Sequence, residues 1–459
     1  MPRYMFPLLL ALAGPASAAD RPNVVFICSD DQRHDTIRAL GNPHIETPNL
    51  DAMTRDGFTF THTFCMGSMQ GAVCVPSRAM FLSGRSLFRV NDQLKDIPTW
   101  PEVFRKAGYH TFGVGKWHNG PASYAKSFDA GGPIFFGGMG DQNKVNVHPF
   151  DPDGKYPKLN LKVGGAYSTT MFAESAIDFV NTYKGEKPFF LYVTLTVPHD
   201  PRTPPAGWET KYDPAKLPLP KNYLPQHPFN NGELLIRDEK LLGWPRTEAQ
   251  IRKETADYYA MISHMDSQVG RIRDAVKKRG SETLVIFTSD HGLALGSHGL
   301  LGKQNLYDHS VRAPLVMVGP GVPAGMRSAA LVYLFDIFPT TAEVCGVKLP
   351  DGVDGKSLVP VMSGKQEKVR DVVFGAYRQF QRSVRTDSWK LIRYPHVNHT
   401  QLFDLKADPD ETKNLAADPA FADRVKDMTA LLVEQQKQFG DTQPLTSAKP
   451  AAMQIELKK

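Results

Sequence analysis

The feature that most constrains the fold is a series of short, uninterrupted apolar runs that alternate with helical patterns. Between the last two runs, apolar residues recur at spacings of three and four over residues 259–276, which predicts an amphipathic helix. Alternating strands and helices form a mostly parallel sheet covered by helices on both faces. We therefore expect an α/β fold with a large, doubly wound, mixed or parallel sheet. The runs that we expect to be strands buried on both faces are residues 23–28, 110–114, 188–197 and 284–288.

After about residue 369 the pattern changes to short strands without long helices between them. An amphipathic helix over residues 421–432 then follows. This order predicts a smaller antiparallel sheet plus a helix, and so a C-terminal subdomain at residues 370–459 after a main domain at residues 20–369. The expected strands are residues 372–377, 379–385, 389–394 and 401–405.

The first residues have the pattern of a cleaved export signal. Arg3 precedes an apolar stretch at residues 4–13, and small residues follow at positions 14–19. The stretch is shorter than the ~20 apolar residues that span a bilayer, and no later segment reaches that length. A frayed tail or a membrane anchor explains the pattern less well. We expect a signal peptide at residues 1–19 and a secreted or periplasmic protein with no membrane span.

The charge balance excludes some partners. The chain has 54 Lys and Arg against 48 Asp and Glu, which gives a formal net charge of +6 without long basic runs. Nucleic-acid-binding chains concentrate basic residues, so we expect no nucleic-acid partner. The small basic excess is compatible with a small anionic substrate. The four cysteines, at positions 28, 65, 74 and 345, are too scattered for a CxxC metal site or a disulfide framework.

Reactive side chains follow each of the predicted buried strands. In an open α/β sheet the ligand binds beyond the carboxyl ends of the strands, so we expect these side chains to meet. Taken alone, Asp30 and Asp31 are better explained by a capping or loop role, but a second acidic strand end favours a metal site. Oxygen-rich ligation indicates a hard divalent cation such as Ca²⁺ or Mg²⁺. The strand-end residues are Asp30 and Asp31, Lys116 and His118, His199, and Asp290 and His291.

The most specific string is Cys-Val-Pro-Ser-Arg-Ala-Met-Phe-Leu-Ser-Gly-Arg at residues 74–85. Pro76 predicts a helix that starts near Cys74 and places the cysteine at its N-terminus. Free amides and the positive end of the helix dipole favour an anion there. The residues alone allow two interpretations, an activated thiolate or an inert buried cysteine.

The pattern Cys74-x-Pro-Ser-Arg followed by Ser-Gly-Arg resembles the maturation and active-site signature of the formylglycine-dependent sulfatases, which belong to the alkaline phosphatase superfamily. The resemblance extends over residues 21–440 and includes Lys303 and the C-terminal pattern at residues 403–416. His291 stands where many members have asparagine and others have histidine. The resemblance implies an alkaline-phosphatase-like fold with residues 20–369 as the catalytic domain.

The resemblance also implies a role for each reactive residue. Cys74 would be oxidised to formylglycine by a maturation enzyme, and one hydroxyl of its hydrated form would attack sulfur. One Ca²⁺ would be bound by Asp30, Asp31, Asp290, His291 and the residue at position 74. The other catalytic residues would be Arg78 at the nucleophile, Lys116 and Lys303 at the sulfate oxygens, His118 as the base and His199 as the leaving-group acid.

We therefore expect an exported sulfatase that hydrolyses sulfate esters, with a sulfated carbohydrate as the substrate class. A phosphonate monoester or phosphodiester hydrolase could use the same formylglycine site. A non-catalytic sulfated-glycan binder with Cys74 as a thiol fits less well, because the lysines and histidines are all present. The irregular segments at residues 119–165 and 201–245 are expected to determine specificity. The residues that either line the pocket or have structural roles are His298, Tyr307, His309 and Arg312.

Overall fold

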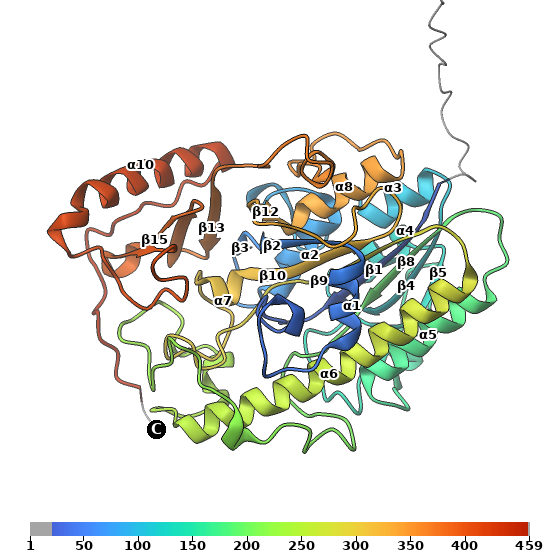
Figure 1. The fold of residues 1–459 in the computed structure, drawn as a ribbon, viewed down its shortest axis with the longest axis horizontal. Helices are drawn as coiled ribbons and strands as arrows, with labels where there is room; N and C mark the ends of the chain where they lie inside the picture. Colours follow the sequence, from blue (N-terminus) through green and yellow to red (C-terminus); the bar gives the residue numbers. More distant parts are fainter. Residues whose placement is uncertain (1–20, 458–459) are drawn as a thin grey trace, which may run out of the picture.

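The computed structural model of the chain describes residues 21–457, so the predicted signal peptide at residues 1–19 lies outside the described residues. Within residues 21–457, the centre is a nine-stranded sheet with the order β11-β2-β10-β9-β1-β8-β4-β5, in which β12 also pairs with β2 (Figure 1). The strands β9, β1, β8, β4 and β5 all run parallel to one another. The strand β10 runs antiparallel to both of its neighbours, β9 and β2. The predicted mixed sheet is confirmed. Its strands are β1 (Asn23–Ser29), β2 (Phe58–Phe64), β4 (His110–Lys116), β5 (Ala130–Phe135), β8 (Phe189–Thr194), β9 (Thr283–Ser289), β10 (Arg312–Val318), β11 (Met326–Ser328) and β12 (Val332–Tyr333).

Helices cover both faces of this sheet (Figure 1). One face packs against α1 (Pro48–Asp56), α5 (Ser168–Thr182) and α6 (Glu248–Arg279). The other packs against α2 (Cys74–Ser83), α3 (Trp100–Lys106), α4 (Pro121–Ser127) and α8 (Ile337–Val344). In β1, Val25 and Ile27 enter the first core, while Val24 and Phe26 enter the second, which is why residues 24–28 form an unbroken apolar run. No helix among residues 21–457 is long and apolar enough to cross a bilayer.

The second sheet confirms the predicted antiparallel sheet with a helix. Within the described residues it has five strands, and α10 (Ala422–Phe439) packs on it (Figure 1). Its last strand, β3 (Gly67–Ser68), comes from the chain just before α2 and runs parallel to β13. The chain leading to Cys74 is therefore tied to the C-terminal sheet. The strand order is β16 (His399–Asp404), β15 (Trp389–Tyr394), β14 (Gln381–Arg385), β13 (Val373–Tyr377) and β3.

The segment at residues 119–165 contains more regular structure than its composition indicates. It includes α4, the strand β5 and a hairpin of β6 (Asn146–Val147) and β7 (Lys162–Val163). Gly131 in β5 is required by close contact, since a Cβ there would lie 2.4 Å from the carbonyl oxygen of Gly113 in β4. The prediction of an irregular segment is wrong for β5, because its glycines serve strand packing and not a turn. Residues 201–245, in contrast, contain short 3₁₀ turns at Pro214–Lys216 and Asp238–Leu241.

The carboxyl ends of β1, β4, β8 and β9 lie at one edge of the sheet. Ser29 is in register with Ser289, and Thr194 is in register with both Cys28 and Gly115. The residues that follow these strands are therefore brought together, as expected for a ligand site in this class of fold.

Candidate active site

Potential metal ligands meet at this edge of the sheet. A carboxylate oxygen of Asp30, one of Asp290, a ring nitrogen of His291 and the sulfur of Cys74 all lie within 4.8 Å of one another. All four side chains are buried. Asp31 joins the cluster, because its Oδ1 lies 3.4 Å from His291 Nε2 and its amide donates to Asp290 Oδ1 at 3.1 Å.

Two buried atoms of the cluster, Asp30 Oδ1 and His291 Nε2, lack a hydrogen-bond partner among the described residues. His291 Nδ1 donates to the carbonyl oxygen of Gly292 at 2.9 Å, so Nε2 is the ring atom that faces the carboxylates. Buried polar atoms normally have partners. Carboxylate oxygens around one imidazole nitrogen fit a divalent cation, which would supply the missing partner of both atoms.

The electrostatics also favour a cation here. Burial penalises the ionised carboxylate, but His199 and Lys303 lower the pKa of Asp31 to about 2. Burial also disfavours a charged His291, yet Asp290 and Asp31 raise its pKa to about 9. A proton is thus held between carboxylates at neutral pH, and a metal ion would bind in its place.

Cys74 begins α2 and lies in an electropositive environment. Its Sγ is 3.3 Å from His118 Nδ1 and 3.7 Å from Lys116 Nζ. Burial raises the pKa of this thiol, but Lys116 and Lys303 outweigh burial, so the pKa is lowered. Of the two interpretations that the sequence left open, the structure favours the activated cysteine. Burial instead raises the pKa of the other cysteines, Cys28, Cys65 and Cys345.

Arg78 and Lys116 are buried cations that hold the cluster together. Arg78, one turn along α2 from Cys74, donates from Nε to Asp290 Oδ2 and from Nη1 to the carbonyl oxygen of Lys116, both at 3.0 Å. The Lys116 ammonium donates to Asp30 Oδ2 and, at 2.5 Å, to the carbonyl oxygen of Gly138. Removing either cation would leave a buried carboxylate without charge compensation.

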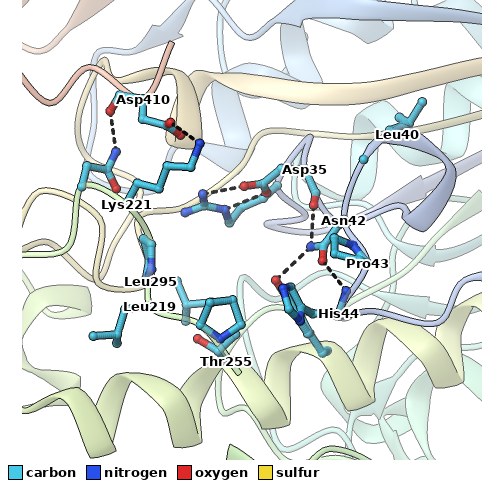
Figure 2. Close-up of a pocket in the computed structure, with 16 residues that line it drawn as sticks. Asp35, Leu40, Asn42, Pro43, His44, Leu219, Lys221, Thr255, Leu295 and Asp410 are labelled. Atoms are coloured by element: carbon cyan, nitrogen blue, oxygen red, sulfur yellow. Dashed lines mark hydrogen bonds and ion pairs between the residues drawn. The ribbon is translucent and has the colours of Figure 1, made fainter. Parts of the chain in front are cut away.

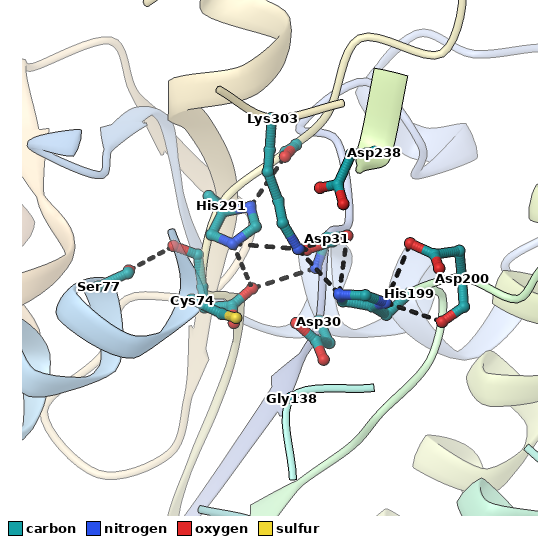
Figure 3. A network of polar contacts seen from close by, with 12 residues as sticks. Asp30, Asp31, Cys74, Ser77, Gly138, His199, Asp200, Asp238, His291 and Lys303 are labelled. Carbon is teal, nitrogen blue, oxygen red and sulfur yellow. Dashed lines mark hydrogen bonds and ion pairs between the residues drawn. The ribbon is translucent and has the colours of Figure 1, made fainter. Parts of the chain in front are cut away.

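Lys303 and His199 lie beside Asp31 (Figure 3). Lys303 Nζ donates to the two oxygens of Asp31 at 2.8 and 3.0 Å and to His199 Nε2 at 2.9 Å. His199 Nδ1 donates to the carbonyl oxygen of Asp200 at 2.9 Å, and the Asp200 carboxylate pairs with Arg237. The structure therefore brings every predicted catalytic and metal-ligating residue into one cluster.

Glu239 supports this cluster but was not predicted from the sequence. It accepts hydrogen bonds from the amides of Leu301 and Gly302, immediately before Lys303, at 2.9 and 2.8 Å. Its carboxylate also pairs with the buried Arg246 at 2.8 Å. No periodicity marks the proline-rich segment around Glu239, so the sequence offered no signal for this role.

The structure places the four residues near Lys303 whose role the sequence leaves open in contacts outside the catalytic cluster. The rings of His298 and Tyr307 stack with centroids 3.8 Å apart, and His298 Nδ1 lies 3.2 Å from His309 Nε2. Arg312 Nε donates to the carbonyl oxygen of Thr61 at 2.7 Å. These contacts favour structural roles for the four residues.

A cavity of about 320 Å³ lies beside the segment that follows β1 and is lined by residues 218–222 and by α6 (Figure 2). Arg33 donates to the two oxygens of Asp35 at 2.9 and 2.8 Å, and Lys221 lies 3.2 Å from Asp410. These charged groups are satisfied by each other. None of the described catalytic candidates lines this cavity, so it is distinct from the candidate active site.

Comparison with known proteins identifies the family. The family model described as Sulfatase matches residues 22–347, and one described as N-sulphoglucosamine sulphohydrolase, C-terminal, matches residues 296–438. An N-acetylglucosamine-6-O-sulfatase of Bacteroides thetaiotaomicron is 26% identical, with 92% of this chain and 88% of the relative covered. A choline-sulfatase of Rhizobium meliloti is 28% identical, with 87% and 83% covered.

Solved structures agree with this assignment. A protein in complex with its substrate D-glucosamine-2-N,6-O-disulfate has a TM-score of 0.77 and 26% identity, and the match covers 93% of this chain and 99% of that chain. A phosphonate monoester hydrolase from Silicibacter pomeroyi has a TM-score of 0.70 and 24% identity, covers 95% and 99%, and shows likeness of fold alone. Since the Sulfatase model matches well over half of its residues, the chain belongs to the sulfatase family and is a sulfuric ester hydrolase with an alkaline-phosphatase-like fold.

Proposed function

We propose that this protein hydrolyses sulfate esters of carbohydrates with a formylglycine made from Cys74 and one bound Ca²⁺. The observation that carries the proposal is the position of Cys74. Its sulfur lies among potential metal ligands from two strand ends and also beside Lys116 and His118. A nucleophile at this place is next to a cation site and to groups that stabilise an anionic sulfate.

The cation would be held by Asp30, Asp31, Asp290 and His291, with the modified residue 74 as a further ligand. When bound, it supplies positive charge that lowers the pKa of a hydroxyl nucleophile and polarises the sulfate. Ca²⁺ is the hard cation that we favour, because the set is dominated by carboxylates.

The charges of the cluster support a divalent cation. Once the metal replaces the proton on His291, the carboxylates of Asp30, Asp31 and Asp290 are matched, among the described residues, by an equal number of buried cations. A divalent ion would then balance one negative charge on the sulfate ester and one on the ionised nucleophile, which a buried site requires. The matching cations are Arg78, Lys116 and Lys303.

Side chains of the protein would bind the sulfate and move protons. Lys116, beside Asp30, and Lys303, beside Asp31, would donate to sulfate oxygens as charge develops. Burial and the nearby Lys116 lower the pKa of His118 to about 2, so this ring is neutral without substrate. To act as the base, it would need the negative charge of the bound sulfate to raise that pKa. His199 would protonate the leaving oxygen through Nε2, which accepts from Lys303 in the structure and would have to gain a proton first, while Nδ1 stays bonded to the backbone. Formylglycine would allow sulfate to be expelled without attack of water on sulfur.

The names of relatives support a carbohydrate substrate, because one is an N-acetylglucosamine-6-O-sulfatase and a solved structure contains a sulfated glucosamine. Specificity would come from the segments at residues 119–165 and 201–245 and from the C-terminal subdomain at residues 370–459. Conversion of Cys74 would require a formylglycine-generating maturation enzyme as a partner. The predicted signal peptide at residues 1–19 would make the protein secreted or periplasmic.

Peptide mass spectrometry of protein coexpressed with a maturation enzyme tests this function. The peptide that contains Cys74 should be lighter than its thiol form, and hydrolysis of 4-nitrophenyl sulfate should rise with the converted fraction. Cys74→Ala should be inactive. Sulfatase activity in protein whose Cys74 is entirely a thiol would contradict the proposal. Full conversion with hydrolysis of phenyl phosphonate but not of phenyl sulfate would favour the phosphonate or phosphodiester alternative.

A further inference from the structure

We propose that Gly138 is a positioning residue of the active site. Its carbonyl oxygen fixes the ammonium of Lys116, and the absence of a side chain leaves room for the imidazole of His118. The proposal rests on the catalytic roles proposed above for Lys116 and His118. Gly138 lies in the glycine-rich segment of residues 136–140, far from the string around Cys74 in sequence.

The first observation concerns the N–H groups of the Lys116 ammonium, which is fully buried. An ammonium has three donors. One points to Asp30 Oδ2 and one to the carbonyl oxygen of Gly138 at 2.5 Å, and Cys74 Sγ lies 3.7 Å away for the third. With two donors fixed, the third is aimed at the nucleophile.

The second observation concerns the space around His118. A Cβ on Gly138 would lie 2.9 Å from both Cε1 and Nε2 of the imidazole, which is too close for two non-bonded atoms. Nδ1 of the same ring is the atom that faces Cys74 Sγ. The backbone of His118 is held in the left-handed region, with φ at 67°, and the neighbouring Asn119 side chain donates to the carbonyl oxygen of Val75 in α2 at 2.9 Å. The imidazole therefore cannot retreat from a side chain at position 138 without leaving Cys74.

The third observation is that the segment around Gly138 is fixed at both ends. The Trp117 amide donates to the carbonyl oxygen of Phe135 at 2.9 Å. Gln142 is 1% exposed, and its side chain donates to the carbonyl oxygen of His199 at 3.2 Å and accepts from Thr196 Oγ1 at 2.8 Å. A movement of Gly138 away from His118 would therefore strain the anchored segment and stretch the bond from its carbonyl oxygen to Lys116.

Gly138→Ala, with Gly140→Ala as the matched control, tests the proposal. In the described part of the chain, a Cβ on Gly140 meets no atom closer than the ring of Phe135, at 3.8 Å. Neither glycine has a positive φ, so the backbone accepts alanine at both positions. We expect Gly138→Ala to lower kcat for 4-nitrophenyl sulfate about tenfold or more, because a displacement of 1 Å can cost about a hundredfold. Gly140→Ala should retain the wild-type kcat.

A double variant separates positioning from general damage. In a His118→Ala background the methyl group of Gly138→Ala enters the space that the imidazole leaves. The further loss of kcat should then be less than about twofold, and any loss in the thermal unfolding midpoint should be recovered. An equal loss of kcat with and without His118 would overturn the proposal, as would a wild-type kcat in the single variant.

A third measurement does not depend on turnover. Protein made without a maturation enzyme keeps Cys74 as a thiol, and inorganic sulfate should raise its unfolding midpoint more than sodium chloride of equal ionic strength. We expect a smaller rise in Gly138→Ala than in Gly140→Ala, and equal rises would overturn the proposal. If the wild-type protein with Cys74 converted to formylglycine has no sulfatase activity, the proposed function is contradicted. The sulfate-binding comparison would still test the role of Gly138 in that case.

Discussion

Replacement of Asp290 by asparagine tests the metal site with little change in side-chain volume. Asp290 Oδ1 accepts from the Asp31 amide at 3.1 Å, and Oδ2 accepts from Arg78 Nε at 3.0 Å. Its carboxylate also lies 3.7 Å from His291 Nε2. Asparagine removes the charge that a hard cation requires. We therefore expect Asp290→Asn to fold and to lose its affinity for Ca²⁺.

The size of the effect follows from linkage between binding and folding. An ion that binds only the folded state stabilises it by RT ln(1 + [L]/Kd), which is ~2.7 kcal/mol at about 100 times Kd. Loss of an outer-shell partner alone weakens metal binding by about 10- to 100-fold, so about 100-fold is a conservative value for a direct ligand. The same concentration then contributes only RT ln 2, or ~0.4 kcal/mol. The calcium-dependent stabilisation should fall by ~2.3 kcal/mol.

Urea unfolding with calcium and with a chelator measures this difference. The quantity compared between variant and wild type is the change in unfolding free energy that calcium causes. The absolute stabilities are not compared, because loss of the Asp290 charge also alters the contacts of Arg78 in the metal-free protein. Asp354→Asn is a suitable control, since that carboxylate bonds to Ser86 and Arg89 outside the cluster. It should keep the full calcium response. A wild-type response in Asp290→Asn, or a wild type that responds to neither Ca²⁺ nor Mg²⁺, would refute the reasoning.

Two further predictions concern buried carboxylates. Glu239→Ala should lower the free energy of unfolding by about 3–5 kcal/mol, because Arg246 is 1% exposed and would stay buried without its partner. Urea unfolding measures this loss, and a value below about 1 kcal/mol would count against it. Burial raises the pKa of Asp266 to about 6, above its unfolded value, so the contribution of this group is full at low pH and is lost as pH rises from about 4 to about 6. Relative to Asp266→Asn, the wild type should lose about 3 kcal/mol across this window, and parallel pH profiles would exclude the shift.

Some elements could be predicted from the sequence because burial alone determines their residue pattern. Both faces of β1 and β8 pack against helices, so residues 24–28 and 189–193 of these strands form unbroken apolar runs. One face of α6 is buried along its length, which gives the helical period. β5 could not be predicted, because its closeness to β4 requires Gly131, and glycine in a sequence favours a turn.

The same division applies to the site. Asp30 and Asp290 could be identified because each directly follows a buried strand, and the ends of neighbouring parallel strands must meet. Gly138 and Glu239 could not be identified. Gly138 acts through its contact with Lys116, and Glu239 acts through its contact with the amide of Gly302. Neither a glycine nor a glutamate in a sequence indicates such a distant contact.

The catalytic cluster does not by itself determine which sulfate ester is hydrolysed, because relatives named as N-acetylglucosamine-6-O-sulfatase and choline-sulfatase match most of this chain. The segments proposed to determine specificity are not uniformly available for that role. Phe135, Gly138 and Gln142 bond to Trp117, Lys116 and His199, so a change at one of these three positions disturbs catalysis as well. The β6-β7 hairpin, in contrast, exposes 63% of Val163. Selection for a new sulfate ester can therefore act on the outer part of residues 119–165, while the inner part is constrained by its contacts with the catalytic cluster.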